Sequence, residues 1–386
     1  RMARSAALSG IDVQNLAWGQ SYAHRKRPDW ILNWIQRNQR GAVTPPPTEA
    51  TRSSGESDSF DDPPPGSNDH STTSTTSSSA GANNASRPLD DWDVVMFLDG
   101  GDSAFTGATP KEILSRFMGL TVADVDTSLM DPSRLANEAM QKKLIDVQER
   151  MGQPRLRKRN HPVPLLFNAE ANCFHQQLFD GGWAAKKSRC ITTYKKHNPW
   201  AQSKWRYLNA GGWIGYVWAV KRFFGEVRKL LAAKPSLWCD QSVIGGLYLS
   251  GEFSNLVHID TASTLYLPTY HLRDTDFCIA DANDAGFEGR VNIDEVLAGD
   301  PSRGLRVCGS GRTPAVLHFN GKSEAKRADT LLRRSVWHMR AQRDDGKRAA
   351  VQVLQSAKVS LDRNDGTPVE RKLFKDACPG FAQVPT

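Results

Sequence analysis

Runs of apolar residues, separated by polar stretches, mark the strands of this chain. The residues Val94 to Leu98 are five consecutive apolar positions, and two aspartates spaced as Asp99-x-x-Asp102 follow them directly. A short unbroken apolar run of this kind is typical of a buried strand. Similar short runs predict further strands at Val163–Phe167, Asn255–Ile259 and Ala315–His318.

Helices are expected between these strands. The spacing of apolar positions predicts helices at Asp29–Asn38 and Trp218–Leu231. The small residues of Asn209–Gly215 predict a glycine-rich turn that leads from a strand into the second helix. Strands that alternate with helices indicate an α/β fold with ligands at the carboxyl edge of its sheet.

Polar segments interrupt this pattern. Residues 42–89 hold two runs of three prolines and a long Ser/Thr run, so they predict a disordered insertion. A helix-favouring polar stretch predicts a second insertion at about 120–160, and residues 324–386 are expected to form a basic helical C-terminal extension. Because the chain begins in a helix-like segment, Ala3 to Leu8, we expect the first strand of the sheet and any targeting signal to lie upstream.

Composition narrows the class of protein. With 386 residues, 39% of them hydrophobic, the chain can bury a sizeable core. No apolar run approaches the roughly 18 residues that a helix needs to span a membrane, so no membrane-spanning helix is expected in this sequence. Six cysteines without a Cys-x-x-Cys pair argue against a structural zinc site and leave disulfides open. The net charge of +8 is concentrated in residues 155–159 and 322–348, which are either solvated helix faces or a surface for a phosphate-bearing partner.

The paired aspartates carry the first chemical prediction. Two carboxylates at a strand end offer hard oxygen ligands to a divalent metal that accompanies a phosphorylated substrate. The alternative is that Asp99 and Asp102 only close turns or cap helices. On the first interpretation, the chain is an enzyme acting on a nucleotide or sugar phosphate.

Four further motifs follow the aspartates in order: Phe167-Asn-Ala-Glu170, Tyr207-Leu-Asn-Ala-Gly-Gly-Trp-Ile-Gly215, Asp240-Gln241 and His318-Phe-Asn-Gly321. Together, over about residues 10–325, the five motifs resemble the glycosyltransferase domain of the lysyl hydroxylases and the related procollagen glycosyltransferases. The resemblance implies a GT-A type α/β domain over residues 1–323. It also implies a UDP-glucose or UDP-galactose donor, Mn²⁺, a protein or glycan hydroxyl acceptor such as hydroxylysine, and the lumen of the endoplasmic reticulum or Golgi. No nucleic-acid partner is expected.

By position, the resemblance implies Asp99, Asp102 and His318 as metal ligands, a set that suits Mn²⁺. His318 has the alternative of being an ordinary strand-end histidine. The resemblance implies catalytic roles for Asp240, near the reacting carbon, and Glu170, beside the donor sugar or metal-bound water. Donor contacts are assigned to Arg27, Trp30, Asn209, Gly211, Gly212, Gln241, Asn320, Gly321 and Lys322. The chain departs from the family pattern at Gly100 and Gly101, where an aromatic residue is usual, and at Cys239, where an aspartate is expected.

Two other functions fit parts of the sequence. His258, Asp260 and His318, with Arg327, match the spacing of the iron ligands and oxoacid-binding arginine of Fe(II)/2-oxoglutarate oxygenases. The basic runs and Cys239 also fit a non-catalytic polyanion-binding protein with a degenerate transferase fold. The three alternatives differ in their metal and substrate dependence.

Overall fold

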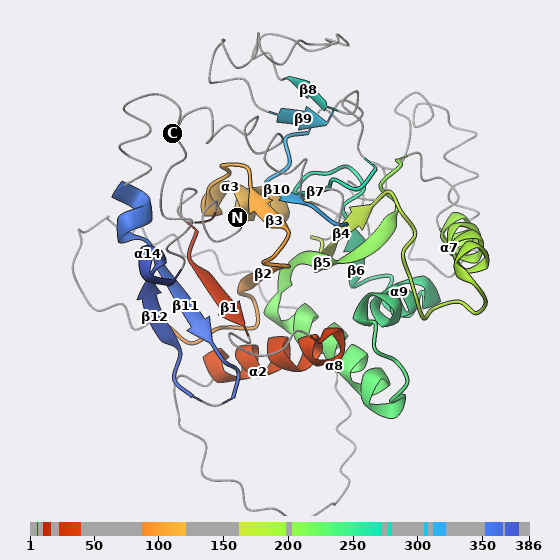
Figure 1. Cartoon of the computed structure of the whole chain (residues 1–386), viewed down its shortest axis with the longest axis horizontal. Coiled ribbons are helices and arrows are strands. Elements are labelled where there is room, and N and C mark those ends of the chain that lie inside the picture. The colour runs from red at the N-terminus through yellow and green to blue at the C-terminus, as the bar shows by residue number, and fades with distance from the viewer. Residues whose placement is uncertain are drawn as a thin grey trace, which may run out of the picture.

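The computed structural model describes residues 6, 11–16, 23–39, 87–120, 162–197, 203–271, 277–279, 305–307, 312–321, 352–365 and 367–377. These residues form a mixed α/β structure with several small sheets and flanking helices (Figure 1). Nearly all of the predicted disordered insertion, the predicted helical insertion beyond residue 120 and most of the predicted basic helix lie outside the described residues, as does the start of the chain apart from residue 6. No described helix combines the length and the apolarity needed to cross a membrane.

The central sheet has four strands in the order β2 (Val94–Leu98), β5 (Tyr207–Tyr216), β4 (Leu165–Glu170) and β6 (Val257–Ile259). Strand β5 is antiparallel to both β2 and β4, and β6 is parallel to β4. Consequently β2, β4 and β6 all run in one direction, and their carboxyl ends lie at the same edge of the sheet. The strands predicted before Asp99, near residue 163 and near residue 257 are confirmed.

The glycine-rich segment is a correction to the sequence analysis. Asn209–Gly215 is not a turn, because it lies inside β5, the ten-residue strand paired with both β2 and β4. Its glycines allow close packing: a Cβ added at Gly215 would lie 2.7 Å from Cδ1 of Leu165, and one at Gly212 would lie 3.2 Å from the ring of Tyr266. Glycine in a strand marks such close approaches as well as turns.

Helices cover one face of the central sheet. The predicted helices are confirmed as α2 (Arg27–Gln39) and α8 (Val217–Ala233), which pack together below the sheet in Figure 1. Phe223 and Phe224 of α8 are fully buried, and both rings contact Phe167 of β4. Their burial fixes α8 against the sheet through the hydrophobic effect.

Two more helices lie beside α8. Helix α9 (Asp240–Ser250) packs against α8 and β5, and α7 (Trp183–His197) packs against α9 at the periphery of the molecule (Figure 1). Helix α9 begins at Asp240 and is capped at its C-terminal end by Gly251, whose φ of 79° is readily adopted only by glycine. The short helix η1 (His24–Lys26) leads into α2.

A second sheet lies next to the carboxyl edge of the first. Its strands are β3 (Ser103–Phe105), β10 (Val316–His318) and β7 (Tyr266–Pro268), with β10 in the middle. Strand β10, predicted from its apolar run, is antiparallel to β3 and parallel to β7. Helix α3 (Pro110–Met118) follows β3 and begins with a capping box between Thr109 and Glu112.

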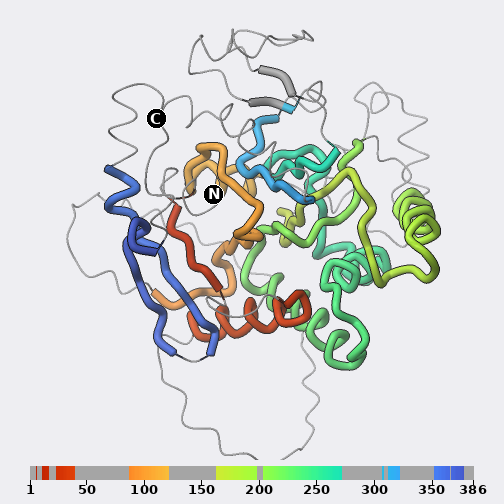
Figure 2. The backbone as a smooth tube through the Cα atoms, in the orientation of Figure 1, coloured from red at the N-terminus to blue at the C-terminus, as the bar shows by residue number. Residues whose placement is uncertain are grey.

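In the described part of the C-terminal extension, residues 352–356 are helical as expected, but the residues after them differ from the expected helix. Strands β11 (Lys358–Asp362) and β12 (Glu370–Leu373) form a hairpin that ends in α14 (Phe374–Ala377). Strand β11 pairs in parallel with β1 (Val13–Leu16), and Figure 2 shows these blue and red segments side by side. Strands β8 (Phe277–Ile279) and β9 (Leu305–Val307) form a separate antiparallel pair.

Candidate functional site

The two aspartates lie in the short connection from β2 to β3. Backbone hydrogen bonds hold both ends of this connection: the Asp99 amide donates to the Gly211 carbonyl at 2.8 Å, and the Asp102 carbonyl accepts from the Phe319 amide at 2.6 Å. The connection is therefore fixed between β5 of one sheet and the end of β10 in the other. Gly100 and Gly101 form its turn.

His318 is the last residue of β10 and is buried. Its Nδ1 pairs with the side-chain amide of Asn168 at 2.9 Å, and its Nε2 faces Oδ1 of Asp102 at 3.4 Å. Asp99, Asp102 and His318 each place one ligand atom within 4.8 Å of the other two. The structure thus brings together the three residues that the sequence analysis assigned to a metal.

The chemistry of this cluster fits a divalent cation. Oδ1 of Asp102 is buried, and apart from Nε2 of His318 at 3.4 Å it faces no hydrogen-bond donor within the described structure, which leaves a carboxylate oxygen available to a ligand. Two carboxylates and one imidazole suit Mn²⁺ and similar hard or intermediate ions. Space is kept open by Gly211, where an added Cβ would lie 2.7 Å from Nε2 of His318.

Arg27 connects this cluster to Asp240. Its guanidinium is almost completely buried at the start of α2, with 3% of the residue exposed. One terminal nitrogen lies 3.0 Å from Oδ1 of Asp99, and the other lies 3.0 Å from Oδ2 of Asp240. A UDP-sugar donor that contacts Arg27, as predicted, would therefore have to share the guanidinium with these two carboxylates.

Burial and neighbouring charges shift the pKa values of the residues in this cluster. Burial raises the pKa of Asp99, and the positive charges of Arg27 and His318 only partly oppose this effect. Burial also disfavours the charged form of His318, but the hydrogen bond to Asp102 and the carboxylates of Asp99 and Glu170 outweigh it and raise the pKa of the imidazole. A bound cation would balance the negative charge of these carboxylates in place of the proton on His318.

Glu170 ends β4 on the same side of the sheet and is 3% exposed. Its two carboxyl oxygens accept from the side-chain amides of Gln241 at 2.9 Å and Asn320 at 2.7 Å. Burial raises the pKa of Glu170 to about 8, although His318 and the amide donors act in the opposite direction. Glu170 is therefore neutral at slightly acidic pH in the absence of a further cation.

Asp240 is the first residue of α9 and is fully buried. Besides Arg27, it contacts His24, whose Nδ1 lies 3.0 Å from Oδ1 of Asp240. This hydrogen bond is the main cause of a raised pKa of His24. His24 and Asn168 were not predicted as site residues, because neither residue stands out in the sequence as part of a polar cluster.

The remaining predicted residues occupy defined places. Asn209 is buried, and its side-chain oxygen accepts from the Gly211 amide at 2.8 Å, so this side chain supports β5 locally. Gly212 pairs with Leu98 across the sheet. Gly321 has a φ of 113° and packs against Tyr270, a conformation that an L side chain rarely adopts. Trp30 is half-buried on α2, and Lys322 lies outside the described residues.

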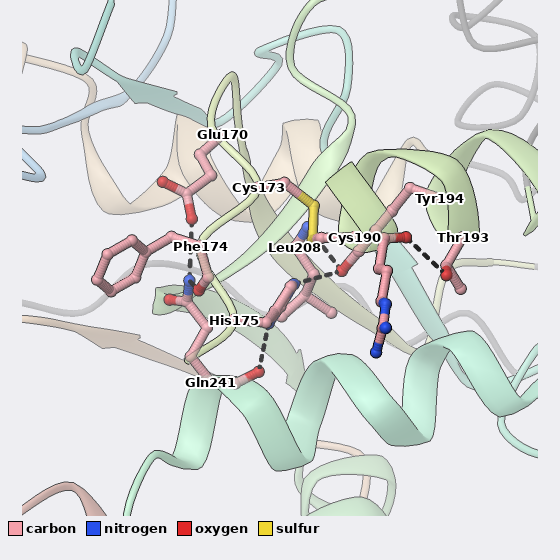
Figure 3. Close-up of a disulfide and its surroundings, with 10 residues drawn as sticks. Glu170, Cys173, Phe174, His175, Cys190, Thr193, Tyr194, Leu208 and Gln241 are labelled. Carbon is pink, nitrogen blue, oxygen red and sulfur yellow. Dashed lines mark hydrogen bonds between the residues drawn. A yellow bond between two sulfur atoms is a disulfide. The ribbon is translucent and has the colours of Figure 1, made fainter. Parts of the chain in front are cut away.

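A disulfide supports the loop that follows Glu170. Cys173 and Cys190 are bonded, which joins this loop to α7 (Figure 3). Next to the disulfide, the ring of His175 stacks on Tyr194, and its nitrogens pair with the Tyr194 hydroxyl at 2.9 Å and the Gln241 carbonyl at 3.1 Å. Burial lowers the pKa of His175 to about 4, so this histidine is a neutral packing group. The sequence alone left the pairing of the cysteines open.

The alternative iron site is not assembled. Asp260 is buried and directs both carboxyl oxygens at the backbone amides of residues 264, 265 and 266, at 2.7 to 2.9 Å. His258, Asp260 and His318 are all described, and they are not among the groups whose ligand atoms converge. His318 instead faces Asp102. The basic runs behind the polyanion-binding alternative lie outside the described residues.

Comparisons with known proteins add no assignment. Neither a protein-family model nor a curated protein matches this chain.

Proposed function

We propose that this protein is a metal-dependent glycosyltransferase of the GT-A type, which transfers glucose or galactose from a UDP-sugar to a hydroxyl group of a protein or glycan. The observation that carries the proposal is the convergence of Asp99, Asp102 and His318 at the end of β2. It joins carboxylates and an imidazole that are separated by more than 200 residues in the sequence. The mixed α/β sheet with its site at the carboxyl ends of β2 and β4 supports the same proposal.

The three ligands would hold Mn²⁺ in this proposal. Such an ion, when bound, neutralises the charge that develops on departing UDP. Asp240 is assigned the reacting side of the site, where it orients the acceptor hydroxyl or stabilises positive charge on the sugar. Arg27 fixes the distance between Asp99 and Asp240, because it is paired with both. Glu170, with Gln241 and Asn320, supplies hydrogen-bonding groups toward the donor.

The compartment proposed from the resemblance is the lumen of the endoplasmic reticulum or Golgi. A buried disulfide between Cys173 and Cys190 supports an oxidising environment. A hydroxylated or glycosylated protein side chain is the proposed acceptor in that compartment.

Calorimetric titration with UDP tests the proposal directly. We expect UDP to bind in the presence of Mn²⁺ and to lose most of its affinity when EDTA replaces the metal, as a metal-bridged diphosphate requires. Asp102→Ala should have the same effect as EDTA, since it removes one of the three ligands. Asp376→Ala, an exposed carboxylate on α14, is the matched control and should bind UDP normally. UDP affinity that is independent of both Mn²⁺ and Asp102 would overturn the assignment.

A turnover assay separates the remaining alternatives. We expect Mn²⁺-dependent hydrolysis of UDP-glucose or UDP-galactose by the wild-type protein, with loss of activity in Asp240→Asn. Turnover of 2-oxoglutarate with Fe²⁺, or no turnover with either system, would contradict a transferase function.

A further inference from the structure

Helix α7 is strongly and uniformly basic. Its 15 residues include five lysines and arginines and no acidic residue. The cations are Lys186, Lys187, Arg189, Lys195 and Lys196. Arg189, Lys195 and Lys196 are exposed, and none of the five has an acidic partner within the described structure.

We propose that α7 is a docking surface for an acidic segment of the acceptor protein, which it holds beside the transferase site. This inference rests on the proposed function and adds to it the class of acceptor. The occupant is an extended peptide in which carboxylates flank the hydroxyl that receives the sugar.

The position of α7 connects it to the site. Cys190 on the helix is bonded to Cys173, three residues after Glu170. Phe174 follows in the same loop; its carbonyl accepts from Gln241 at 2.8 Å, and its ring contacts Trp183 at the start of α7. Figure 3 shows the loop between Glu170 and the helix, with Phe174 directed away from the disulfide. A peptide bound along α7 would therefore be held next to the loop that connects this helix to Glu170 and Gln241.

Helix stability does not account for the distribution of charge. Cations at the C-terminal end of a helix are favoured by its dipole, which explains Lys195 and Lys196. Lys186 and Lys187 lie near the N-terminal end, where the dipole disfavours positive charge, and no acidic side chain occupies the first turn. Lys186 and Arg189 are also three positions apart, a spacing at which like charges repel. A negatively charged partner would relieve both unfavourable terms.

The surroundings leave the positive charge largely uncompensated. The nearest carboxylate in the sequence is exposed Asp180, three residues before the helix. Within the described residues, Arg189 donates to the backbone carbonyl of Asp180 at 3.4 Å and Lys186 to that of Gln176 at 2.7 Å, so neither contact is with a carboxylate. The adjacent helix α9 carries one carboxylate, Asp240, which is buried and paired with Arg27 and His24. Because no carboxylate of the described residues pairs with these cations, we assign the complementary charge to a ligand. The face between Arg189 and Lys196 exposes polar rather than apolar side chains, which favours a peptide over a membrane as that ligand.

Fluorescence anisotropy provides the test, with UDP and Mn²⁺ present. The probe is the labelled peptide Gly-Glu-Glu-Ser-Gly-Glu-Glu-Gly, and its counterpart has glutamine at every glutamate. We expect the wild-type protein to bind the acidic peptide more tightly. Lys195→Glu/Lys196→Glu should weaken this binding by about tenfold, as expected for loss and reversal of two exposed charge contacts.

The matched control is Arg222→Glu/Arg228→Glu, which makes the same change of charge on the exposed face of α8. It should leave peptide binding nearly unchanged, and both double variants should bind UDP like the wild type. With UDP binding intact, any of three results would overturn the inference. The wild type could bind the two peptides equally well, or the two double variants could lose the same affinity for the acidic peptide. Alternatively, the α7 substitutions could affect binding to phosphatidylserine vesicles and not to the peptide. Loss of Mn²⁺-dependent UDP binding in the wild type would instead overturn the transferase proposal.

Discussion

Single residues in the site compensate one another's charges. Arg27 is shared by Asp99 and Asp240, while His318 is turned toward Asp102. Each buried charge therefore has a partner of opposite sign, as burial in a low dielectric requires. Glu170 is the exception, because its partners are neutral amides.

This exception predicts a pH-dependent stability. The pKa of Glu170 is about 8 in the folded protein, against an ordinary value of 4.5. Between these pH values Glu170 holds a proton in the folded state but not in the unfolded state. Its contribution to the free energy of unfolding is therefore fully present below about pH 4.5 and is lost as pH rises toward 8. The free energy of unfolding should fall by up to about 1.4 kcal/mol per pH unit over this range. Glu170→Gln should remove this slope, as measured by urea unfolding in EDTA at several pH values.

The control for this experiment is Glu252→Gln. Glu252 is exposed, so its substitution should leave the slope of the wild type unchanged. A Glu170→Gln variant whose stability falls with pH as steeply as that of the wild type would show that the carboxyl group is ionised in the folded protein.

Gly211 predicts a steric effect on the metal site. Alanine at this position would place Cβ 2.7 Å from Nε2 of His318, so the imidazole must shift from the position in which it faces Asp102. We expect Gly211→Ala to weaken Mn²⁺-dependent UDP binding at least about tenfold and to destabilise the fold by about 1–3 kcal/mol. Calorimetry and urea unfolding measure the two effects.

Gly225→Ala offers the matched comparison. An added Cβ has no neighbour within 4 Å at this position in α8, and alanine is favoured over glycine in a helix by about 1 kcal/mol. The variant should be stable and bind UDP normally. Normal UDP binding by Gly211→Ala would contradict the proposed position of the ion.

At the scale of elements, the disulfide is a covalent cross-link between the site loop and the middle of α7. Cys173 and Cys190 are 17 positions apart, and closing a loop of this length contributes about 3 kcal/mol in the chain-entropy model. We expect Cys173→Ala/Cys190→Ala to lower the free energy of unfolding by about that amount. Dithiothreitol should lower the stability of the wild type similarly and have no further effect on the double variant.

Cys239→Ala is the control, because Cys239 is buried and free. Its response to dithiothreitol should equal that of the wild type. If the wild type were insensitive to the reductant and as stable as the double variant, the bond would not form in the folded protein.

For the whole molecule, the long polar insertion is predicted to be dispensable. Residues on its two sides are already joined: the Leu89 amide donates to the Asn38 carbonyl at 2.9 Å, and Gln39 donates to Asp91 at 2.7 Å. Replacing residues 42–86 by a short Gly-Ser linker should therefore leave the thermal transition and Mn²⁺-dependent UDP binding nearly intact. Insoluble protein, or a transition lowered by many degrees, would mean that the insertion packs against the fold.

The two ends of the described chain also meet at this scale. Strands β1 and β11 pair across the molecule, and buried Asp362 binds Arg37 of α2 at 2.6 Å and Gln14 of β1 at 3.2 Å. Sequence patterns could not indicate this sheet, because β1 and β12 are short and mostly polar or half-exposed. Their strand conformation follows from pairing with β11, a contact between distant segments.

Local pattern by itself determined the strands β2, β4, β6 and β10 and the helices α2 and α8, because unbroken apolar runs and helical spacing report burial directly. It also singled out the pair Asp99 and Asp102, whereas His318 was added to them only through the motif resemblance. It failed at Asn209–Gly215, since glycine signals both turns and tightly packed strands, and only the pairing of β5 with β2 and β4 decides between them.

Tertiary structure decided the rest. The partners of Arg27, the disulfide between Cys173 and Cys190, and the separation of Asp260 from His318 depend on where distant segments pack. The basic face of α7 is visible in the sequence, but its connection to Glu170 is not. These features are contacts between residues far apart in the chain, and their energies depend on burial and geometry that local sequence patterns do not contain.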